Sequence, residues 1–338
     1  MKDGRTLPSE SYTKRARLQS RTIEDIIDPG RVLNHLAQGA TVVLQALHRY
    51  WEPVTRFCRE LELDLTHPVQ INIYLTPPAS RGLDVHYDTH DVFVLQVAGA
   101  KHWKVYGSAI DLPLAHQRRK GSYPEPGEAQ IDIELAPGDC LYIPRGFLHA
   151  AETATSESAH MTVGILTYTW MDVLKAATEK ATNEVFLRDA LPPGFAHAPA
   201  DMESRARAVM KEVAAWIERS PVDELMESVA ERFWSGRPPL LTGQLQEVLA
   251  IDRLGDDSLV RRRAGAVCRL ALEGDELVAL LGDRRLSMPA HVEGVMRQIL
   301  DCSEFKIDEL ASHLDGPSRI VLVRRLIMEG LLEQTPSD

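Results

Sequence analysis

The first half of the chain is a series of short apolar runs separated by turns, and the second half follows a helical period. The runs at 69–75, 92–97, 101–106 and 159–165 are rich in β-branched and aromatic residues. Such runs predict buried strands. Strand, turn and strand at this rhythm are typical of a small double-sheet barrel of the jelly-roll type. The pattern therefore predicts an α+β protein that begins with a double-stranded β-helix.

Two apolar stripes at helical spacing lie beyond residue 170. One stripe runs over 202–217 and the next over 222–233, and each repeats every three or four residues, as one face of a helix does. Between them, Ser220 predicts an N-cap and Pro221 the first residue of the second helix. So short a helical hairpin has more apolar surface than it can bury alone. Its stripes pack either against a second copy of the chain or against this chain's own barrel.

The segments before and after these regions also follow recognisable patterns. Residues 42–51 predict an amphipathic helix, and Glu52-Pro53 opens another. Beyond residue 240 the chain predicts a β-hairpin and then three short helices, at 267–281, 290–302, 307–314 and 317–330. We therefore expect a barrel with N-terminal helices, a helical region and a C-terminal domain, with the bounds 1–170, 171–239 and 240–338.

Candidate metal ligands gather in the barrel. His86-Tyr87-Asp88 lies in an extended apolar stretch, and His149 ends the run 137–149. A His-x-Asp pair on a strand places both side chains on one face, and a third ligand from a neighbouring strand would complete two histidines and one carboxylate. This face is diagnostic of non-haem Fe(II) oxygenases, because it leaves positions open for co-substrate and O₂. Other histidines are expected to be surface or structural residues: His90, His102, His116 and His160.

The wider motif resembles a known family. It consists of His86-Tyr87-Asp88-Thr89-His90-Asp91-Val92-Phe93-Val94-Leu95-Gln96, then Gly99-Ala100-Lys101-His102-Trp103, then Pro137-Gly138-Asp139, Pro144-Arg145-Gly146 and His149. These strings are similar to the JmjC-type ribosomal oxygenases, from about Leu65 to the C-terminus. The resemblance implies a cupin fold and an Fe(II)- and 2-oxoglutarate-dependent hydroxylase of ribosomal proteins. It also implies a helical region that forms a homodimer and a winged-helix-like C-terminal domain.

The resemblance assigns roles position by position. By this resemblance the iron ligands are His86, Asp88 and His149. Lys101 matches the residue that binds the distal carboxylate of 2-oxoglutarate, and Asn72 and Tyr74 match residues that line the co-substrate pocket. The physics agrees, because a dicarboxylate that chelates iron at one end needs a fixed cation at the other, and a buried charge has to be paired. Two other interpretations stay open. Lys101 also fits a solvated strand end, and Asn72 and Tyr74 fit polar residues of a barrel interior.

One position departs from the family. On the strand 159–165, Gly164 stands where family members carry a hydroxyl residue. One polar contact of the pocket would then be missing, which affects the choice of prime substrate but not iron or co-substrate binding. The segment Ala115–Gln130 is long enough to form a rim loop around the mouth of the pocket.

Charge bears on the kind of partner. The 338 residues carry a net charge of −11, which argues against a nucleic-acid binder and fits a basic ribosomal protein or cationic peptide. From Leu241 onward the chain has 12 Arg and Lys against 17 Asp and Glu, despite the run Arg261-Arg262-Arg263. A DNA-binding module should have a basic face. We therefore expect the C-terminal domain to be structural or to contact protein, with no direct nucleic-acid binding.

The remaining composition predicts a cytoplasmic protein. No run reaches the length of about 18 apolar residues that a membrane span needs, and the start lacks the apolar core of a signal peptide. The cysteines lie far apart and form no Cys-x-x-Cys pair, so they suggest neither a disulfide framework nor a zinc site: Cys58, Cys140, Cys268 and Cys302.

Three functions fit these observations. The first is a 2-oxoglutarate-dependent dioxygenase that hydroxylates a side chain of a protein or peptide, with ribosomal Arg or His as the family default and a biosynthetic peptide or free amino acid as the alternative. The second is a metal cupin that is not such an oxygenase, against which Lys101 argues, because it would need no buried cation there. The third is a cupin sensor joined to a DNA-binding domain, which the acidic C-terminal part disfavours.

Overall fold

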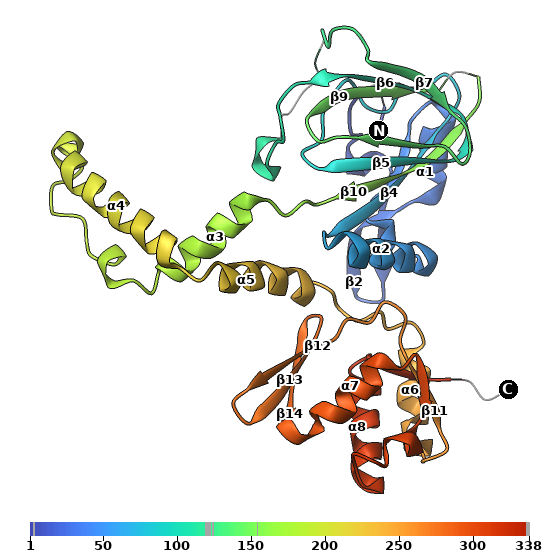
Figure 1. The fold of residues 1–338 in the computed structure, drawn as a ribbon. Helices are drawn as coiled ribbons and strands as arrows, with labels where there is room; N and C mark the ends of the chain where they lie inside the picture. Colours follow the sequence, from blue (N-terminus) through green and yellow to red (C-terminus); the bar gives the residue numbers. More distant parts are fainter. Residues whose placement is uncertain (3, 119–122, 124, 154, 336–338) are drawn as a thin grey trace. The chain divides into compact units, whose positions relative to one another are not determined.

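The computed structural model describes residues 1–2, 4–118, 123, 125–153 and 155–335 (Figure 1). The chain divides into two compact units, residues 1–167 and 168–338. Part of the rim loop predicted at 115–130 lies outside the described residues, namely 119–122 and 124. Within the part of the chain that is described, no helix is long and apolar enough to cross a membrane.

Two antiparallel sheets make up the N-terminal unit (Figure 1). The larger has the strand order β3-β4-β10-β5-β8 and the smaller the order β7-β6-β9. A separate pair, β1 with β2, forms a ribbon of its own. The elements are β1 (Thr13–Leu18), β2 (Arg21–Ile27), α1 (Pro29–Ala37), β3 (Val42–Leu44), α2 (Glu52–Leu65), β4 (Val69–Thr76), β5 (Asp91–Gly99), β6 (Lys101–Ser108), β7 (Ile131–Leu135), β8 (Cys140–Ile143), β9 (Phe147–Glu152) and β10 (Ser158–Ile165).

The core of this unit lies between the two sheets. Side chains of β5 and β8 meet those of β6 and β7 there: Val92, Val94, Ile143, Trp103, Val105 and Leu135. Alternate residues of each strand point to this core, which is why the apolar runs predict the strands. The other face of the larger sheet is covered by α2, whose Val54 and Cys58 pack against β4 and β10. This is the double-stranded β-helix that the sequence predicts.

One N-terminal prediction is wrong. Residues 42–51 do not form a helix: Val42–Leu44 is strand β3, paired with β4, and Leu47–Arg49 is a single 3-10 turn. Ala46 between them has a left-handed backbone with φ 53°, which an α-helix cannot accommodate. The helix predicted to open at Glu52-Pro53 is confirmed as α2, with proline in its first turn.

The helices α3 (Trp170–Ala181), α4 (Glu203–Arg219) and α5 (Val222–Ser235) open the C-terminal unit. Helix α5 buries Leu225, Val229 and Phe233, whereas α4 buries none of its residues. The predicted cap is wrong: Ser220 is the C-cap of α4, its hydroxyl donates to the Trp216 carbonyl at 2.9 Å, and no side chain caps α5. Only Ser220 and Pro221 separate the two helices. Because the Ser220 hydroxyl is already bonded to a carbonyl of α4, it does not cap the start of α5.

The rest of the C-terminal unit contains two three-stranded sheets, β15-β11-β16 and β12-β13-β14. The hairpin predicted at 267–281 is confirmed, and the helix predicted at 307–314 is shorter, a 3-10 turn over Ile307–Leu310. The elements are α6 (Gln244–Ala250), β11 (Leu259–Arg262), β12 (Arg269–Glu273), β13 (Glu276–Leu281), β14 (Arg284–Pro289), α7 (Glu293–Asp301), β15 (Glu304–Lys306), α8 (Gly316–Met328) and β16 (Leu332–Gln334). Separate helical and winged-helix-like domains within this unit stay a prediction.

Candidate metal centre and co-substrate pocket

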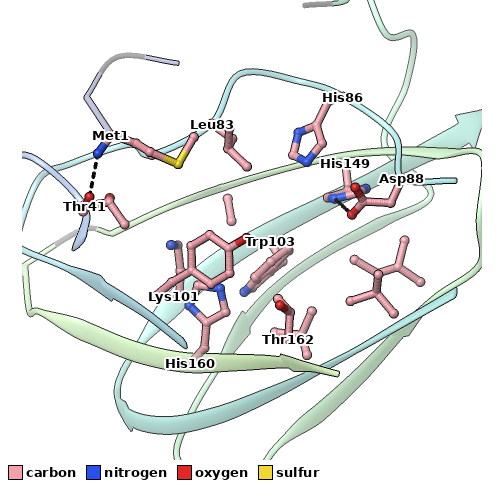
Figure 2. Close-up of a pocket in the computed structure, with 16 residues that line it drawn as sticks. Met1, Thr41, Leu83, His86, Asp88, Lys101, Trp103, His149, His160 and Thr162 are labelled. Atoms are coloured by element: carbon pink, nitrogen blue, oxygen red, sulfur yellow. Dashed lines mark hydrogen bonds and ion pairs between the residues drawn. The ribbon is translucent and has the colours of Figure 1, made fainter. Parts of the chain in front are cut away.

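His86, Asp88 and His149 come together in the wall of one pocket (Figure 2). Each offers one ligand atom, and these atoms all lie within 4.8 Å of one another. His149 Nε2 lies 3.7 Å from Asp88 Oδ2. The sequence prediction was wrong in one respect, because His86 and Asp88 are not on a strand. They lie in the connection between β4 and β5, and His149 lies on β9.

Backbone hydrogen bonds hold this connection against β9. His149 N–H donates to the His86 carbonyl at 2.8 Å, and His86 N–H donates to the His149 carbonyl at 3.2 Å. The Gly146 N–H donates to the Asp88 carbonyl at 2.9 Å. The three candidate ligands are therefore brought together by pairing between distant segments, and no ion is needed to explain their proximity.

The orientation of both imidazoles suits metal binding. Nδ1 of His86 is 2.7 Å from the Asp84 carbonyl, and Nδ1 of His149 is 3.1 Å from the Phe147 carbonyl. A carbonyl oxygen can only accept, so each Nδ1 carries the proton and each Nε2 keeps a lone pair. Metal-ligating histidines are fixed in this way. Burial and the neighbouring His86 lower the pKa of His149 to about 4, which keeps its ring in the neutral form that a metal requires.

Lys101 lies inside the same pocket, between the two sheets (Figure 2). Only 4% of it is exposed, and its ammonium donates to Thr76 Oγ1 at 3.0 Å. Burial lowers the pKa of Lys101 to about 8. Among the described residues no carboxylate pairs with it. A buried cation without a counter-charge is costly, so this pocket suits an anion. The distal carboxylate of a dicarboxylate co-substrate would supply this anion.

The two other predicted pocket residues are placed differently. Tyr74 lines the pocket, its hydroxyl is hydrogen-bonded to Thr162, and burial raises its pKa. Asn72 is not part of the lining, and its Oδ1 accepts from the Ala46 N–H at 2.9 Å. That hydrogen bond supports the left-handed turn after β3. It is closer to the alternative interpretation, in which Asn72 is a polar residue of the barrel interior. A co-substrate contact for Asn72 stays a prediction.

Other pocket residues were not singled out from the sequence. Trp103 on β6, and His160 and Thr162 on β10, line the pocket together with Lys101, and Thr76 on β4 accepts from the Lys101 ammonium. The signal available was the strand period of two, because Thr76 follows Tyr74 by two positions, and Trp103 follows Lys101 by two. His160 was expected to be structural or on the surface, and it is buried in the pocket wall.

The structure gives a steric reason for glycine at position 164. Gly164 shares the inner face of β10 with His160 and Thr162, because it is two residues further along the strand. A Cβ at this position would lie 2.6 Å from Cδ2 and 2.7 Å from Nε2 of His90. The His90 ring therefore occupies the place that a side chain from β10 would take, and it also lies 3.5 Å from the amide of Gln70.

We expect Gly164→Ser to destabilise the protein by about 1–3 kcal/mol, because the added atoms overlap the His90 ring and force it to move. The double variant Gly164→Ser/His90→Ala should recover most of that loss, since it removes the ring. Urea unfolding followed by tryptophan fluorescence measures both. Equal destabilisation with and without His90 would show that the ring is not the obstacle.

Fold and site together define a class: a double-stranded β-helix with a two-histidine, one-carboxylate face and a buried lysine. Residues 45–173 match the family model of the JmjC domain. These residues form a JmjC domain, and the resemblance to JmjC-type ribosomal oxygenases is confirmed.

Curated relatives include two ribosomal oxygenases and a histidyl-hydroxylase. Ribosomal oxygenase 2 of Mus musculus is 32% identical over 223 residues, 62% of this chain and 47% of the mouse protein. Ribosomal oxygenase 1 of Homo sapiens is 33% identical over 246 residues, 65% of this chain and 38% of the human protein. The bifunctional lysine-specific demethylase and histidyl-hydroxylase NO66 of Culex quinquefasciatus is 33% identical over 193 residues, 51% of this chain and 30% of that protein. The chain spans less than half the length of these relatives.

Solved structures share the fold. The crystal structure of Escherichia coli ribosomal oxygenase YcfD matches with a TM-score of 0.54 and 20% identity, over 97% of this chain and 88% of that one. A structure of YcfD in complex with cobalt and 2-oxoglutarate matches with a TM-score of 0.51 and 18% identity over the same shares. At this identity the likeness concerns the fold alone.

Proposed function

We propose that this protein is an Fe(II)- and 2-oxoglutarate-dependent oxygenase that hydroxylates a side chain of a protein or peptide. The observation that carries the proposal is the combination within one pocket of His86, Asp88 and His149 with a buried cation, Lys101, that pairs with no carboxylate of the described residues. Three ligands on one face leave room for a bidentate co-substrate and O₂. A metal cupin that uses no dicarboxylate has no use for Lys101 in this position.

In this proposal each residue has a defined task. The imidazoles of His86 and His149 and the carboxylate of Asp88 hold Fe(II), while Lys101 and Thr76 hold the distal carboxylate of 2-oxoglutarate. The bound iron would supply O₂ activation, in which one oxygen atom enters the substrate C–H bond and the other enters succinate as 2-oxoglutarate loses CO₂. The aromatic and aliphatic walls of the pocket, Trp103 among them, keep water from the reacting centre.

The proposed prime substrate is a basic ribosomal protein, modified at an arginine or histidine. The relatives named above support this, since they are ribosomal oxygenases and a histidyl-hydroxylase, as does the net charge of −11, which attracts a cationic partner. A second candidate is a biosynthetic peptide or free amino acid. The His90 ring beside Gly164 supports it, because the resemblance implies a hydroxyl side chain at this position and the ring would take its place.

Two measurements test the function. Purified protein with Fe(II) and 2-oxoglutarate should form succinate, and mass spectrometry should find a ribosomal protein of the host that gains one oxygen atom only when the enzyme is present. Succinate formation with an unchanged set of ribosomal proteins would favour the peptide or amino-acid branch. Absence of iron-dependent succinate formation with every class of substrate would refute the oxygenase.

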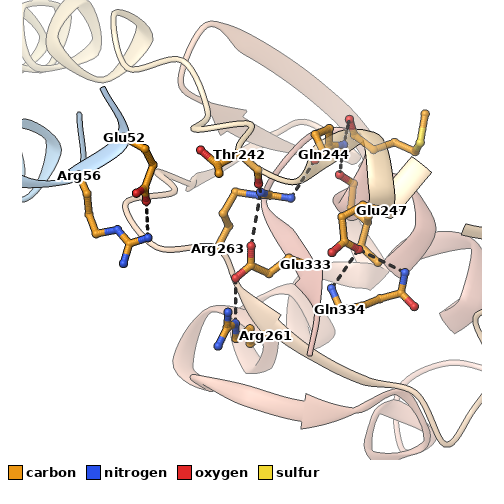
Figure 3. A network of polar contacts seen from close by, with 11 residues as sticks. Glu52, Arg56, Thr242, Gln244, Glu247, Arg261, Arg263, Glu333 and Gln334 are labelled. Atoms are coloured by element: carbon orange, nitrogen blue, oxygen red, sulfur yellow. Dashed lines mark hydrogen bonds and ion pairs between the residues drawn. The ribbon is translucent and has the colours of Figure 1, made fainter. Parts of the chain in front are cut away.

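We further propose that residues 240–338 do not bind nucleic acid directly. Two arginines of the basic run 261–263, Arg261 and Arg263, contact other residues of the same unit (Figure 3). Arg261 pairs with Glu333 at 2.8 Å, and Arg263, 4% exposed, donates to the Thr242 carbonyl at 2.6 Å. Arg262 donates to the Leu300 carbonyl at 3.0 Å. Arg263 is therefore not available to phosphates, and the ion pair with Glu333 offsets the charge of Arg261, so the run forms no strong basic face.

The helical region is proposed to form a two-fold homodimer. Large apolar side chains are exposed on all three helices: Trp170 (82%), Met210 (63%) and Val222 (62%).

We expect the substitution Val213→Glu on α4 to shift the particle toward monomer in light scattering, because a charge would be buried at the contact. Val321→Glu, on the exposed face of α8, is the matched control. Val229 is buried within its own unit, so its substitution would disturb folding. A wild-type protein that is monomeric at micromolar concentration would end the idea.

A further inference from the structure

His160 is a buried polar residue to which the proposed function assigns no task. It lies on β10 and is 2% exposed, and it lines the pocket beside Lys101 (Figure 2). Its ring stacks on Tyr74 with centroids 4.9 Å apart and an interplanar angle of 7°. Trp103 meets it edge-on at 5.3 Å and 90°. Three strands, β4, β6 and β10, thus fix the orientation of this imidazole.

The Nδ1 atom of His160 is fully buried and has no hydrogen-bond partner among the described residues. The indole N–H of Trp103, in the same pocket, is also fully buried and has no hydrogen-bond partner among the described residues. Buried polar atoms are satisfied in the large majority of cases, and an unsatisfied one costs about 1–3 kcal/mol. Both residues line the pocket that also holds the Lys101 ammonium, so an acceptor from outside the chain would satisfy their nitrogens.

The charge state of His160 suits this role. Burial, and then the positive charge of Lys101, lower its pKa well below the usual value, so the ring is neutral and does not repel the lysine. A neutral imidazole has one N–H to donate. A carboxylate has enough lone pairs to accept from that N–H and from the ammonium together. Lys101 uses one of its three N–H groups on Thr76 and has two left for the same carboxylate.

We propose that His160 is a second anchor for the distal carboxylate of the co-substrate, to which its Nδ1–H donates beside the ammonium of Lys101. The inference rests on the proposed function, since it assumes that the pocket holds 2-oxoglutarate. The competing role is packing alone: the ring would serve only to hold Tyr74 and Trp103 in place.

Two substitutions separate these roles. His160→Phe keeps a ring that can stack on Tyr74 but has no nitrogen. His160→Asn loses the ring but keeps an N–H donor close to the position of Nδ1. Calorimetric titration of 2-oxoglutarate into the Mn(II)-loaded protein, without O₂, measures affinity independently of turnover. We expect His160→Phe to bind roughly 10- to 100-fold more weakly, the loss of one hydrogen bond to a charged group, and His160→Asn to stay within about threefold of wild type.

Controls fix the interpretation. His102→Phe, on β6 but outside the pocket lining and paired with Asp132, should bind as wild type does. Titration with 2-oxovalerate, which has the same chain length but no distal carboxylate, should give equal affinities for wild type and His160→Phe. If His160→Phe does not fold, His160→Gln replaces it, because its amide reaches toward Nε2 and should bind more weakly than His160→Asn.

Each outcome bears on a different claim. Wild-type affinity in His160→Phe, or a loss in His160→Asn as large as in His160→Phe, would overturn the anchor and leave His160 as a packing residue. A wild-type protein that does not bind 2-oxoglutarate at all would refute the proposed function, and the anchor with it.

Discussion

The variants His86→Ala, Asp88→Ala and His149→Ala are each expected to lose iron-dependent oxidation of 2-oxoglutarate. Their ligand atoms lie within 4.8 Å of one another, and three ligands are the minimum for a face that holds Fe(II) with positions left open. The loss of metal affinity should exceed the roughly 10–100-fold that follows from removing a residue that only orients a ligand. Titration with Mn(II) and measurement of succinate check the two effects separately.

His90→Ala is the matched control for the metal ligands. His90 lies two residues beyond Asp88 in sequence, but its ring packs on Gly164 and near the Gln70 amide. It should therefore keep its metal and substantial turnover of 2-oxoglutarate. Complete inactivity of His90→Ala together with a functional His149→Ala would mean that the ligand set is wrong.

The second large effect concerns Lys101. Lys101→Ala is expected to bind 2-oxoglutarate on the order of 10²–10³-fold more weakly, because removing one half of a buried ion pair costs about 3–5 kcal/mol. Metal affinity should hardly change, since Lys101 does not contact the proposed ligands. Lys101→Arg should retain part of the binding, as the charge remains but the longer fork needs space. Titration of 2-oxoglutarate into metal-loaded Lys101→Ala decides the matter, and an affinity within about threefold of wild type would mean that Lys101 does not hold the distal carboxylate.

The pKa of Lys101 adds a pH dependence with a definite sign. Burial lowers that pKa to about 8, so the side chain is charged below this pH and loses its proton above it. Apparent affinity for 2-oxoglutarate should be constant at lower pH and fall by up to about tenfold per unit above pH 8, where binding has to include protonation. In Lys101→Arg the side chain stays charged throughout this range, so the slope should vanish. The same slope in Lys101→Arg as in wild type would assign it to another group.

The sequence predicts the barrel strands well because their signal is local. The bounds expected for the strand after Gly99 and for the strand before Leu166 agree with β6 and β10 within a few residues, since alternation of apolar side chains depends on neighbours along the strand. Residues 42–51 were misjudged for the opposite reason. Strand β3 exists through its pairing with β4, and the left-handed Ala46 that separates it from the following turn leaves no apolar pattern.

For the candidate site, too, local features could be predicted from the sequence and long-range pairing could not. Residue types and spacing point to His86, Asp88, His149 and Lys101, but not to the connection between β4 and β5 in which the first two lie. Its position depends on pairing with β9, some sixty residues away in sequence. His160 could not be predicted at all. Its role depends on two rings from other strands and on a nitrogen without a partner, and neither leaves a trace in a sequence pattern.

The backbone pairing of His86 with His149 separates folding from metal loading. In a zinc finger the ion itself drives the chain to fold, so removal of the ion unfolds it. Here two main-chain hydrogen bonds, at 2.8 and 3.2 Å, already join the segments that carry the histidines. The apo form should stay folded after chelation and unfold cooperatively at a lower midpoint temperature, because an ion that binds only the folded state stabilises it. Loss of the ion should therefore lower the stability of this fold without abolishing it, so the metal affinity of each ligand variant can be measured on a folded protein.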